Sequence, residues 1–184
     1  MNIIDLFPKK LLVGKASFEE LYKIYNEIKV HDEDIKSLLE SKTFGDNLNS
    51  TFNNCPCLFE KFKLNYTKSF IQRRVEHYLS LYPGLKNQTI KSTDSWINYN
   101  HPGCFQNSHI HGFDCISGVL YLHTSGDDGE IYFSPGFMEE HFYGVYGFKP
   151  ENGMFLIFHG TLQHGVRVNW SENLRISLSF NFKY

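Results

Sequence analysis

The chain has 184 residues, of which 41% are hydrophobic and 21% are charged, a composition that excludes a disordered chain or a coiled coil. Its 18 Lys and Arg against 20 Asp and Glu leave a net charge of -2, without the basic excess that binds nucleic-acid phosphates. No nucleic-acid partner is therefore expected. The aromatic content of 16% favours a substantial β portion.

The first part of the chain is predicted to be mainly helical. A short edge strand is expected within residues 6–13, where Pro8 disfavours a central position in a sheet. Ser17 is a good N-cap residue and precedes the acidic pair Glu19 and Glu20, whereas Pro83-Gly84 is typical of the end of a helix. Apolar residues at helical spacing predict helices over residues 18–28, 32–39 and 64–81.

From Gln88 onward the apolar runs are short, rich in β-branched and aromatic residues and separated by glycine, as in antiparallel sandwiches and barrels. Strands are predicted over residues 90–99, 116–123, 129–133, 142–146, 154–158, 165–168 and 174–181. The turn-forming segments 125–129 and 169–173 predict hairpin loops. We therefore predict one mainly β, α+β domain over residues 1–184, with a helical part (1–87) that supports a jelly-roll core (88–184).

The chain carries no sequence feature of a membrane or secreted protein. No apolar run approaches the ~18 residues of a membrane span, and Met1–Pro8 lack the basic and apolar regions of a signal peptide. We therefore expect a cytoplasmic protein with no membrane partner, in which the cysteines at 55, 57, 104 and 115 are reduced. The oligomeric state cannot be read from the sequence.

Three of the nine histidines have a spacing that suits a metal site. His109 and His111 point to the same face if the segment is extended, and His164 follows a later predicted strand. Three protein ligands leave positions open for substrate, water or dioxygen, as catalytic metals require. The alternative is that His109 and His111 are surface histidines beside a glycine-rich turn.

Arg175 and Ser177 share one face of the last predicted strand, eleven residues after His164. A buried arginine is costly unless an anion meets it, and a dicarboxylic cosubstrate would be such an anion. Alternatively, Arg175 is a surface residue or pairs with an acidic side chain.

Together these motifs resemble the Fe(II)- and 2-oxoglutarate-dependent oxygenases, which carry H-x-[DE], a distal His and R-x-S about ten residues later. The pattern is most similar to a small bacterial and phage branch related to prolyl hydroxylases. The resemblance rests on Leu6-Phe7-Pro8, Trp96-Ile97-Asn98, His109-Ile110-His111, Ser117-Gly118-Val119-Leu120-Tyr121, His164 and Arg175-Ile176-Ser177-Leu178-Ser179-Phe180-Asn181. It implies a double-stranded β-helix, the cupin-like jelly roll, with supporting N-terminal helices.

The resemblance also implies roles for individual residues. Iron would be bound by His109 and His164, and the 5-carboxylate of 2-oxoglutarate by Arg175. Ser177, Tyr121 and Asn98 would support that cosubstrate, Asn98 through a polar contact from the preceding strand.

One position departs from the family's pattern. His111 stands where the family has a carboxylate, so a site with three histidines is one charge more positive. Asp114 is the alternative second ligand, if the loop curls back.

The resemblance implies a dioxygenase that hydroxylates a C–H bond of a peptide, protein or small molecule and releases succinate and CO2. Two other functions remain open. A cupin-type three-histidine dioxygenase would need no 2-oxoglutarate and would have no use for Arg175 at its spacing. A non-catalytic binding module would use the same fold, with His111 marking a lost iron site.

Overall fold

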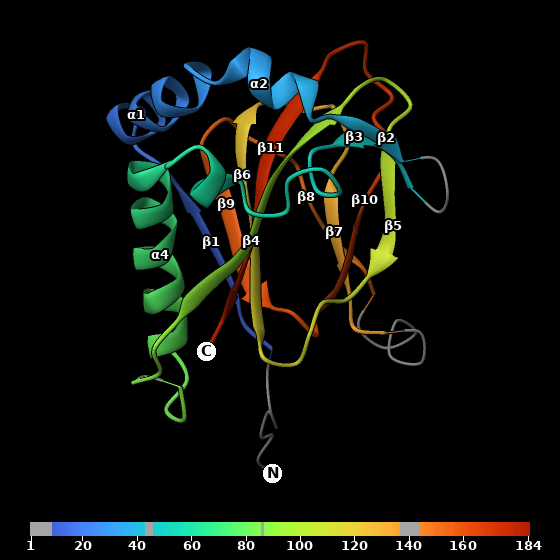
Figure 1. The fold of residues 1–184 in the computed structure, drawn as a ribbon. Coiled ribbons are helices and arrows are strands. Elements are labelled where there is room, and N and C mark those ends of the chain that lie inside the picture. The colour runs from blue at the N-terminus through green and yellow to red at the C-terminus, as the bar shows by residue number, and fades with distance from the viewer. Residues whose placement is uncertain (1–8, 43–45, 86, 137–143) are drawn as a thin grey trace.

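The computed structural model describes residues 9–42, 46–85, 87–136 and 144–184, which form four helices and eleven strands (Figure 1). The helices are α1 (Phe18–Lys29), α2 (Asp32–Ser37), α3 (Leu58–Lys61) and α4 (Asn65–Ser80). The strands are β1 (Leu11–Lys15), β2 (Glu40–Lys42), β3 (Asp46–Ser50), β4 (Lys91–Asn100), β5 (Phe105–His109), β6 (Cys115–His123), β7 (Ile131–Ser134), β8 (Tyr146–Phe148), β9 (Met154–His159), β10 (Gln163–Val166) and β11 (Arg175–Lys183).

The strands form an antiparallel sheet that folds over on itself, the double-stranded β-helix expected from the sequence. One layer has the order β1-β9-β6-β11-β4 and the other has the order β5-β10-β7-β8. Between them β3 pairs with β4 through Asn49 and Ser50 and with β5 through Asp46 and Asn47, and β2 extends this connection by pairing with β3. The two layers are therefore joined along one edge.

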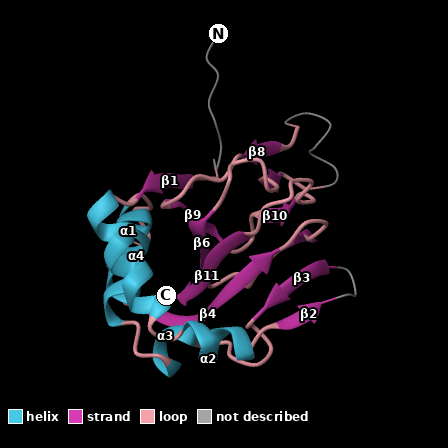
Figure 2. Ribbon diagram, turned by 90° about the horizontal axis from the view of Figure 1, so that it is seen from above, coloured by secondary structure: helices cyan, strands magenta, loops and turns pink. Residues whose placement is uncertain are grey.

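Helices α1 and α4 cover the outer face of the larger layer (Figure 2). Helix α1 starts at a capping box, in which the Ser17 hydroxyl accepts from the Glu20 backbone and the Glu20 carboxylate accepts from the Ser17 N–H. The ring of Phe70 on α4 meets the ring of Phe155 on β9 edge to face, with the centroids 6.0 Å apart. This packing buries one face of the layer and leaves its other face to the interior.

Strand β6 shows why the larger layer has little apolar alternation in its sequence. Ile116 and Leu120 pack into the core under the helices, whereas Val119 and Tyr121 pack into the core between the two layers. Because both faces are buried, neither needs to be polar. The inner face of this layer is one wall of the interior.

Most predicted elements are confirmed. The three predicted helices correspond to α1, α2 and α4, and six of the seven predicted strands to β4, β6, β7, β9, β10 and β11. The strand predicted over residues 142–146 meets β8 only at Tyr146, because residues 144–145 are not part of a strand. Strand β1 is an edge strand, as Pro8 suggested, although residues 6–8 lie outside the described residues, as do residues 142–143 of the strand predicted over 142–146. The proposal of one domain over residues 1–184 is kept, because β1 and β3 from its N-terminal part join the same sheet.

The prediction that segments 125–129 and 169–173 form hairpin loops is wrong. The first lies between β6 and β7 and the second between β10 and β11, and neither pair of strands is hydrogen-bonded. Both segments instead cross from one layer to the other. Turn-forming residues show where the chain bends, but the pairing of the flanking strands depends on long-range contacts.

Strands β2, β3 and β5 were not predicted. Their sequences are polar and short, and they carry no apolar alternation. Strand β3 is held by three residue pairs with β2, two with β4 and two with β5, and β5 by its pairing with β10 and β3. Tertiary pairing therefore forms these strands against a weak local preference. No described helix is long and apolar enough to span a membrane.

Gly118 on β6 supplies a test of this packing. A Cβ there would lie 2.4 Å from a ring carbon of Phe180 and 2.6 Å from the Leu156 carbonyl oxygen, so Gly118→Ala must displace backbone. We expect the free energy of unfolding in a denaturant titration to fall by about 1–3 kcal/mol. The matched control is Gly84→Ala, where nothing lies within 4 Å of the new Cβ. Equal stability of the two variants would contradict the close approach of β6, β9 and β11.

Candidate functional site

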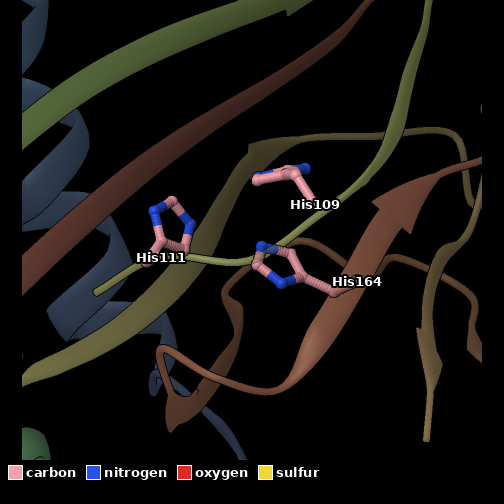
Figure 3. Close-up of side chains that lie close together, drawn as sticks. All are labelled: His109, His111 and His164. Carbon is pink, nitrogen blue, oxygen red and sulfur yellow. The ribbon is translucent and has the colours of Figure 1, made fainter. Parts of the chain in front are cut away.

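Three histidines converge between the two layers (Figure 3). His109 ends β5 and lies directly opposite His164 on β10, so the antiparallel register places their rings 4.4 Å apart, centroid to centroid. His111 lies two residues beyond β5, where its backbone N–H donates to the Gly160 carbonyl at 2.7 Å. The possible ligand atoms of the three rings all lie within 4.8 Å of one another. The cluster has the dimensions of a metal site.

Two of the rings are oriented by backbone carbonyls. Nδ1 of His109 lies 2.9 Å from the Asn107 carbonyl oxygen, and Nδ1 of His164 lies 2.8 Å from that of Leu162. Because a carbonyl oxygen can only accept, each Nδ1 carries the proton in these bonds. The lone pair of each ring is therefore on Nε2, free for a cation, which is the usual arrangement at metal-binding histidines.

The surroundings keep His111 and His164 neutral. Burial, together with the neighbouring His109, lowers the pKa of His164 to about 3 and the pKa of His111 to about 4. Near pH 7 both rings therefore have an unprotonated nitrogen. Metal binding at neutral pH would not have to displace a proton from either ring.

A buried arginine lies in the same cavity. Arg175 is the first residue of β11 and is 2% exposed. Its Nη1 donates to the carbonyl oxygens of Asp128 and Gly129, the first at 2.9 Å. Its Nε has no hydrogen-bond partner and is, among the described residues, the single buried side-chain nitrogen or oxygen atom in that state. A charged donor that is buried and unpaired is costly, so this atom points to a ligand.

The other residues predicted to hold the cosubstrate surround Arg175. Asn98, Ser177 and Tyr121 lie side by side across β4, β11 and β6, and all three line the cavity shared by Arg175 and the histidines. Asn98 donates to the Ser179 hydroxyl at 3.1 Å. Burial raises the pKa of Tyr121 to about 12, so its hydroxyl is a hydrogen-bond donor at neutral pH.

Asp114 does not join the histidines. Its carboxylate pairs with the Lys183 ammonium at 3.0 Å, and both side chains are more than half exposed. This pair holds the pKa of Asp114 below its usual value. His111, and not Asp114, therefore occupies the third position of the cluster.

A second hollow adjoins the first beside His109 and His111. Its lining is mostly uncharged and contains aromatic and amide side chains, namely Leu48, Phe52, Trp96, Asn98, Gln106, His109, His111 and Asn181. Phe52 meets the Trp96 ring edge to face, with the centroids 4.9 Å apart. Leu48, Phe52 and Gln106 were not predicted as site residues, because they lie on or beside the polar strands β3 and β5 that give no sequence signal.

Comparisons with known proteins agree with this geometry. Residues 94–181 match the family model described as "Putative 2OG-Fe(II) oxygenase". This segment runs from β4 to β11 and contains the three histidines and Arg175. No curated protein sequence matches the chain.

Solved structures share the fold at low sequence identity. The epimerase SnoN of nogalamycin biosynthesis, described as non-heme and alpha-ketoglutarate dependent, has a TM-score of 0.69 at 10% identity, over 95% of this chain and 77% of that protein. HygX from Streptomyces hygroscopicus, solved with nickel and 2-oxoglutarate, has a TM-score of 0.64 at 13% identity, over 95% and 82%. A Trichoplax adhaerens prolyl hydroxylase in complex with a peptide of hypoxia inducible factor has a TM-score of 0.67 at 12% identity, over 94% and 83%.

The family match covers the residues that line the cavity except Leu48, and solved structures share the fold over nearly the whole chain. Residues 94–181 therefore match the putative 2OG-Fe(II) oxygenase family in sequence, and the chain shares the fold of solved 2-oxoglutarate-dependent proteins.

Proposed function

We propose that this protein is an Fe(II)- and 2-oxoglutarate-dependent dioxygenase that hydroxylates a C–H bond of its substrate. The observation that carries the proposal is the unpaired Nε of Arg175, buried in the cavity that the three histidines share. A dicarboxylic cosubstrate accounts for both features, because one end can chelate a metal while the other end meets the guanidinium.

The residues present fit both groups. His109, His111 and His164 would hold the iron through three neutral nitrogens, which leaves coordination positions for ligands that are not protein. Arg175 would take the 5-carboxylate of 2-oxoglutarate, with Tyr121 and Ser177 as hydroxyl donors and Asn98 as a further polar contact. Because His111 replaces a carboxylate, the dianionic cosubstrate would balance the metal charge.

Bound iron and 2-oxoglutarate would supply an oxidant for C–H bonds from dioxygen, of which one oxygen atom would end in succinate, released with CO2, and the other in the hydroxylated substrate. The chain itself supplies orientation and exclusion of water. The carbonyls of Asn107 and Leu162 hold the rings of His109 and His164, and burial of Tyr121 and Arg175 keeps solvent away from the cosubstrate.

The hollow lined by Phe52, Trp96 and Gln106 opens beside His109 and His111 and is where we place the substrate. The proposal includes a peptide, protein or small-molecule substrate. HygX and the Trichoplax enzyme, which share the fold, are described with hygromycin B bound and in complex with a peptide, respectively. We also propose a cytoplasmic location, which the four free cysteines support.

A cupin-type dioxygenase that needs no 2-oxoglutarate is the second candidate. The feature that favours it is the all-histidine cluster, without a carboxylate ligand. It leaves the buried Arg175 without a role. Succinate release from 2-oxoglutarate, measured with and without Fe(II), separates the two functions.

Loss of either strand histidine tests the metal site. His109→Ala and His164→Ala should each abolish binding of one equivalent of Fe(II), because two imidazoles remain where three converge. Ni(II) and Zn(II) should bind the wild type more tightly than Fe(II) does. Metal content after anaerobic loading is the measurement, and the exposed His77→Ala is the matched control. Unchanged metal content in both cavity variants would refute the site.

A further prediction concerns His111, which stands where the resemblance implies a carboxylate. His111→Ala should lose metal, whereas Asp114→Ala should keep it, because Asp114 is engaged with Lys183 outside the cavity. His111→Asp should retain or strengthen Fe(II) binding, because a carboxylate restores the family's pattern. If Asp114 proved essential and His111 dispensable, the assignment of the third ligand would be wrong.

Another prediction concerns the affinity for 2-oxoglutarate. Breaking a buried charge pair costs roughly 3–5 kcal/mol, so Arg175→Ala should weaken 2-oxoglutarate binding about a hundredfold to a few thousandfold, at ~1.4 kcal/mol per decade. Arg175→Lys should recover part of this loss. Tyr121→Phe removes one hydrogen bond to a charged group, which is worth about 1.5–3 kcal/mol, and should have a smaller effect.

These affinities are measured by titrating 2-oxoglutarate into the anaerobic Fe(II) protein and following the weak visible charge-transfer band. Arg73→Ala, an exposed arginine on α4, is the matched control. Metal binding should be intact in every variant. The cupin-type function would be favoured if Arg175→Ala bound 2-oxoglutarate as well as the wild type does. It would also be favoured if the wild type bound none at millimolar 2-oxoglutarate.

A further inference from the structure

The turn between β6 and β7 contacts Arg175 directly. Its residues Asp128 and Gly129 present their carbonyl oxygens to Nη1 of the guanidinium. Carbonyl oxygens carry no net charge, so they can orient the arginine without neutralising it. A carboxylate in the same place would compete with an incoming anion for the guanidinium.

The side chain of Asp128 holds the turn. It is fully buried, and its carboxylate accepts the Thr124 hydroxyl at 2.7 and 2.8 Å and the Ser125 backbone N–H at 2.7 Å. No salt bridge of Asp128 is found within the part of the chain that the structure describes. A buried carboxylate is costly unless it organises its surroundings, and here its hydrogen bonds go to the turn.

Gly129 determines the direction in which the turn leaves Asp128. Its φ is +94°, and a Cβ would lie 2.5 Å from the Arg167 carbonyl oxygen and 3.3 Å from Nη1 of Arg175. Any other residue would have to move the backbone that supplies both carbonyls. The position therefore requires glycine for the contact with Arg175.

The turn fixes the orientation of the Arg175 guanidinium. The guanidinium is planar, so fixing Nη1 on two carbonyls also fixes the direction of Nε, the atom that has no partner. A side chain with several rotatable bonds would otherwise lose entropy when a ligand orders it. The turn has already ordered it in the free protein.

We propose that Asp128 and Gly129 are positioning residues that aim the cosubstrate-binding arginine, through a turn locked by the Asp128 carboxylate. The inference rests on the proposed function, because it assigns Arg175 to a carboxylate of 2-oxoglutarate. Asp128 and Gly129 touch neither the metal cluster nor the proposed substrate hollow. Their effect should therefore be confined to ligands that carry a distal carboxylate.

The experiment compares two 2-oxo acids. Both 2-oxoglutarate and 2-oxobutanoate can chelate a metal through the same end, but 2-oxobutanoate has no distal carboxylate for Arg175. Each is titrated into the anaerobic Fe(II)-loaded protein. Groups that orient a binding side chain typically contribute about 10–100-fold, so Gly129→Ala and Asp128→Ala should weaken 2-oxoglutarate by about that factor. Binding of 2-oxobutanoate and of Fe(II) should equal that of the wild type.

Two control variants separate positioning from general damage. Gly126→Ala places an alanine at a φ of +89° in the same turn, but its Cβ lies no closer than 3.8 Å to any other residue, so it should leave 2-oxoglutarate affinity near that of the wild type. Asp128→Asn keeps one oxygen that accepts from the Thr124 hydroxyl and the Ser125 N–H, and should restore most of the affinity lost in Asp128→Ala.

The outcomes are distinct. No 2-oxoglutarate binding by the wild type overturns the proposed function. If the wild type binds 2-oxoglutarate and Gly129→Ala binds it equally well, the positioning role alone is wrong. A parallel loss of affinity for both acids and for metal would also overturn that role, because it would indicate collapse of the site. Because Gly129→Ala keeps the hydrogen bonds of Asp128, it tests the inference even if Asp128→Ala does not fold.

Discussion

A buried guanidinium that forms no salt bridge with any described carboxylate is the constraint on which this site depends. Arg175 is 2% exposed, and its burial lowers its pKa, since the charged form loses its solvation. Two backbone carbonyls stabilise one side of the group and leave Nε unpaired. The free protein therefore keeps a positive charge in its interior that a bound anion would stabilise.

The cavity is assembled from both layers of the sheet. The smaller layer, through β5 and β10, supplies His109 and His164, and the larger layer, through β11 and β6, supplies Arg175 and Tyr121. The spacing of the layers therefore sets the distance between the histidines and the arginine. Strand β3, which pairs with both β4 and β5, and the turn at Gly129 are two of the connections between the layers.

The third histidine is placed by the backbone rather than by a strand. His111 lies beyond the end of β5, and its N–H is bonded to Gly160, which follows β9. A Cβ on Gly160 would lie 2.6 Å from the Gly112 carbonyl oxygen, so the loop that carries His111 packs closely on this glycine. His111 thus lies on a loop whose position is well constrained, and Asp114 remains outside on Lys183.

Local features of this protein can be predicted from its amino-acid sequence. Ser17 and its acidic neighbours start α1, short apolar runs define the strands after residue 90, and the spacing of His109, His111 and Arg175 indicates the chemistry. These signals depend on neighbours along the chain, so they are readable without the fold. The roles of the individual residues remain proposals.

Other features of the fold and the site depend on the tertiary structure. The polar strands β3 and β5 exist because distant strands complete their hydrogen bonds, and the turn at Asp128 crosses between layers because β6 and β7 pair with other strands. The unpaired Nε of Arg175 likewise results from which carbonyls reach it. Each depends on contacts between residues far apart in the chain, whose partners no local pattern specifies.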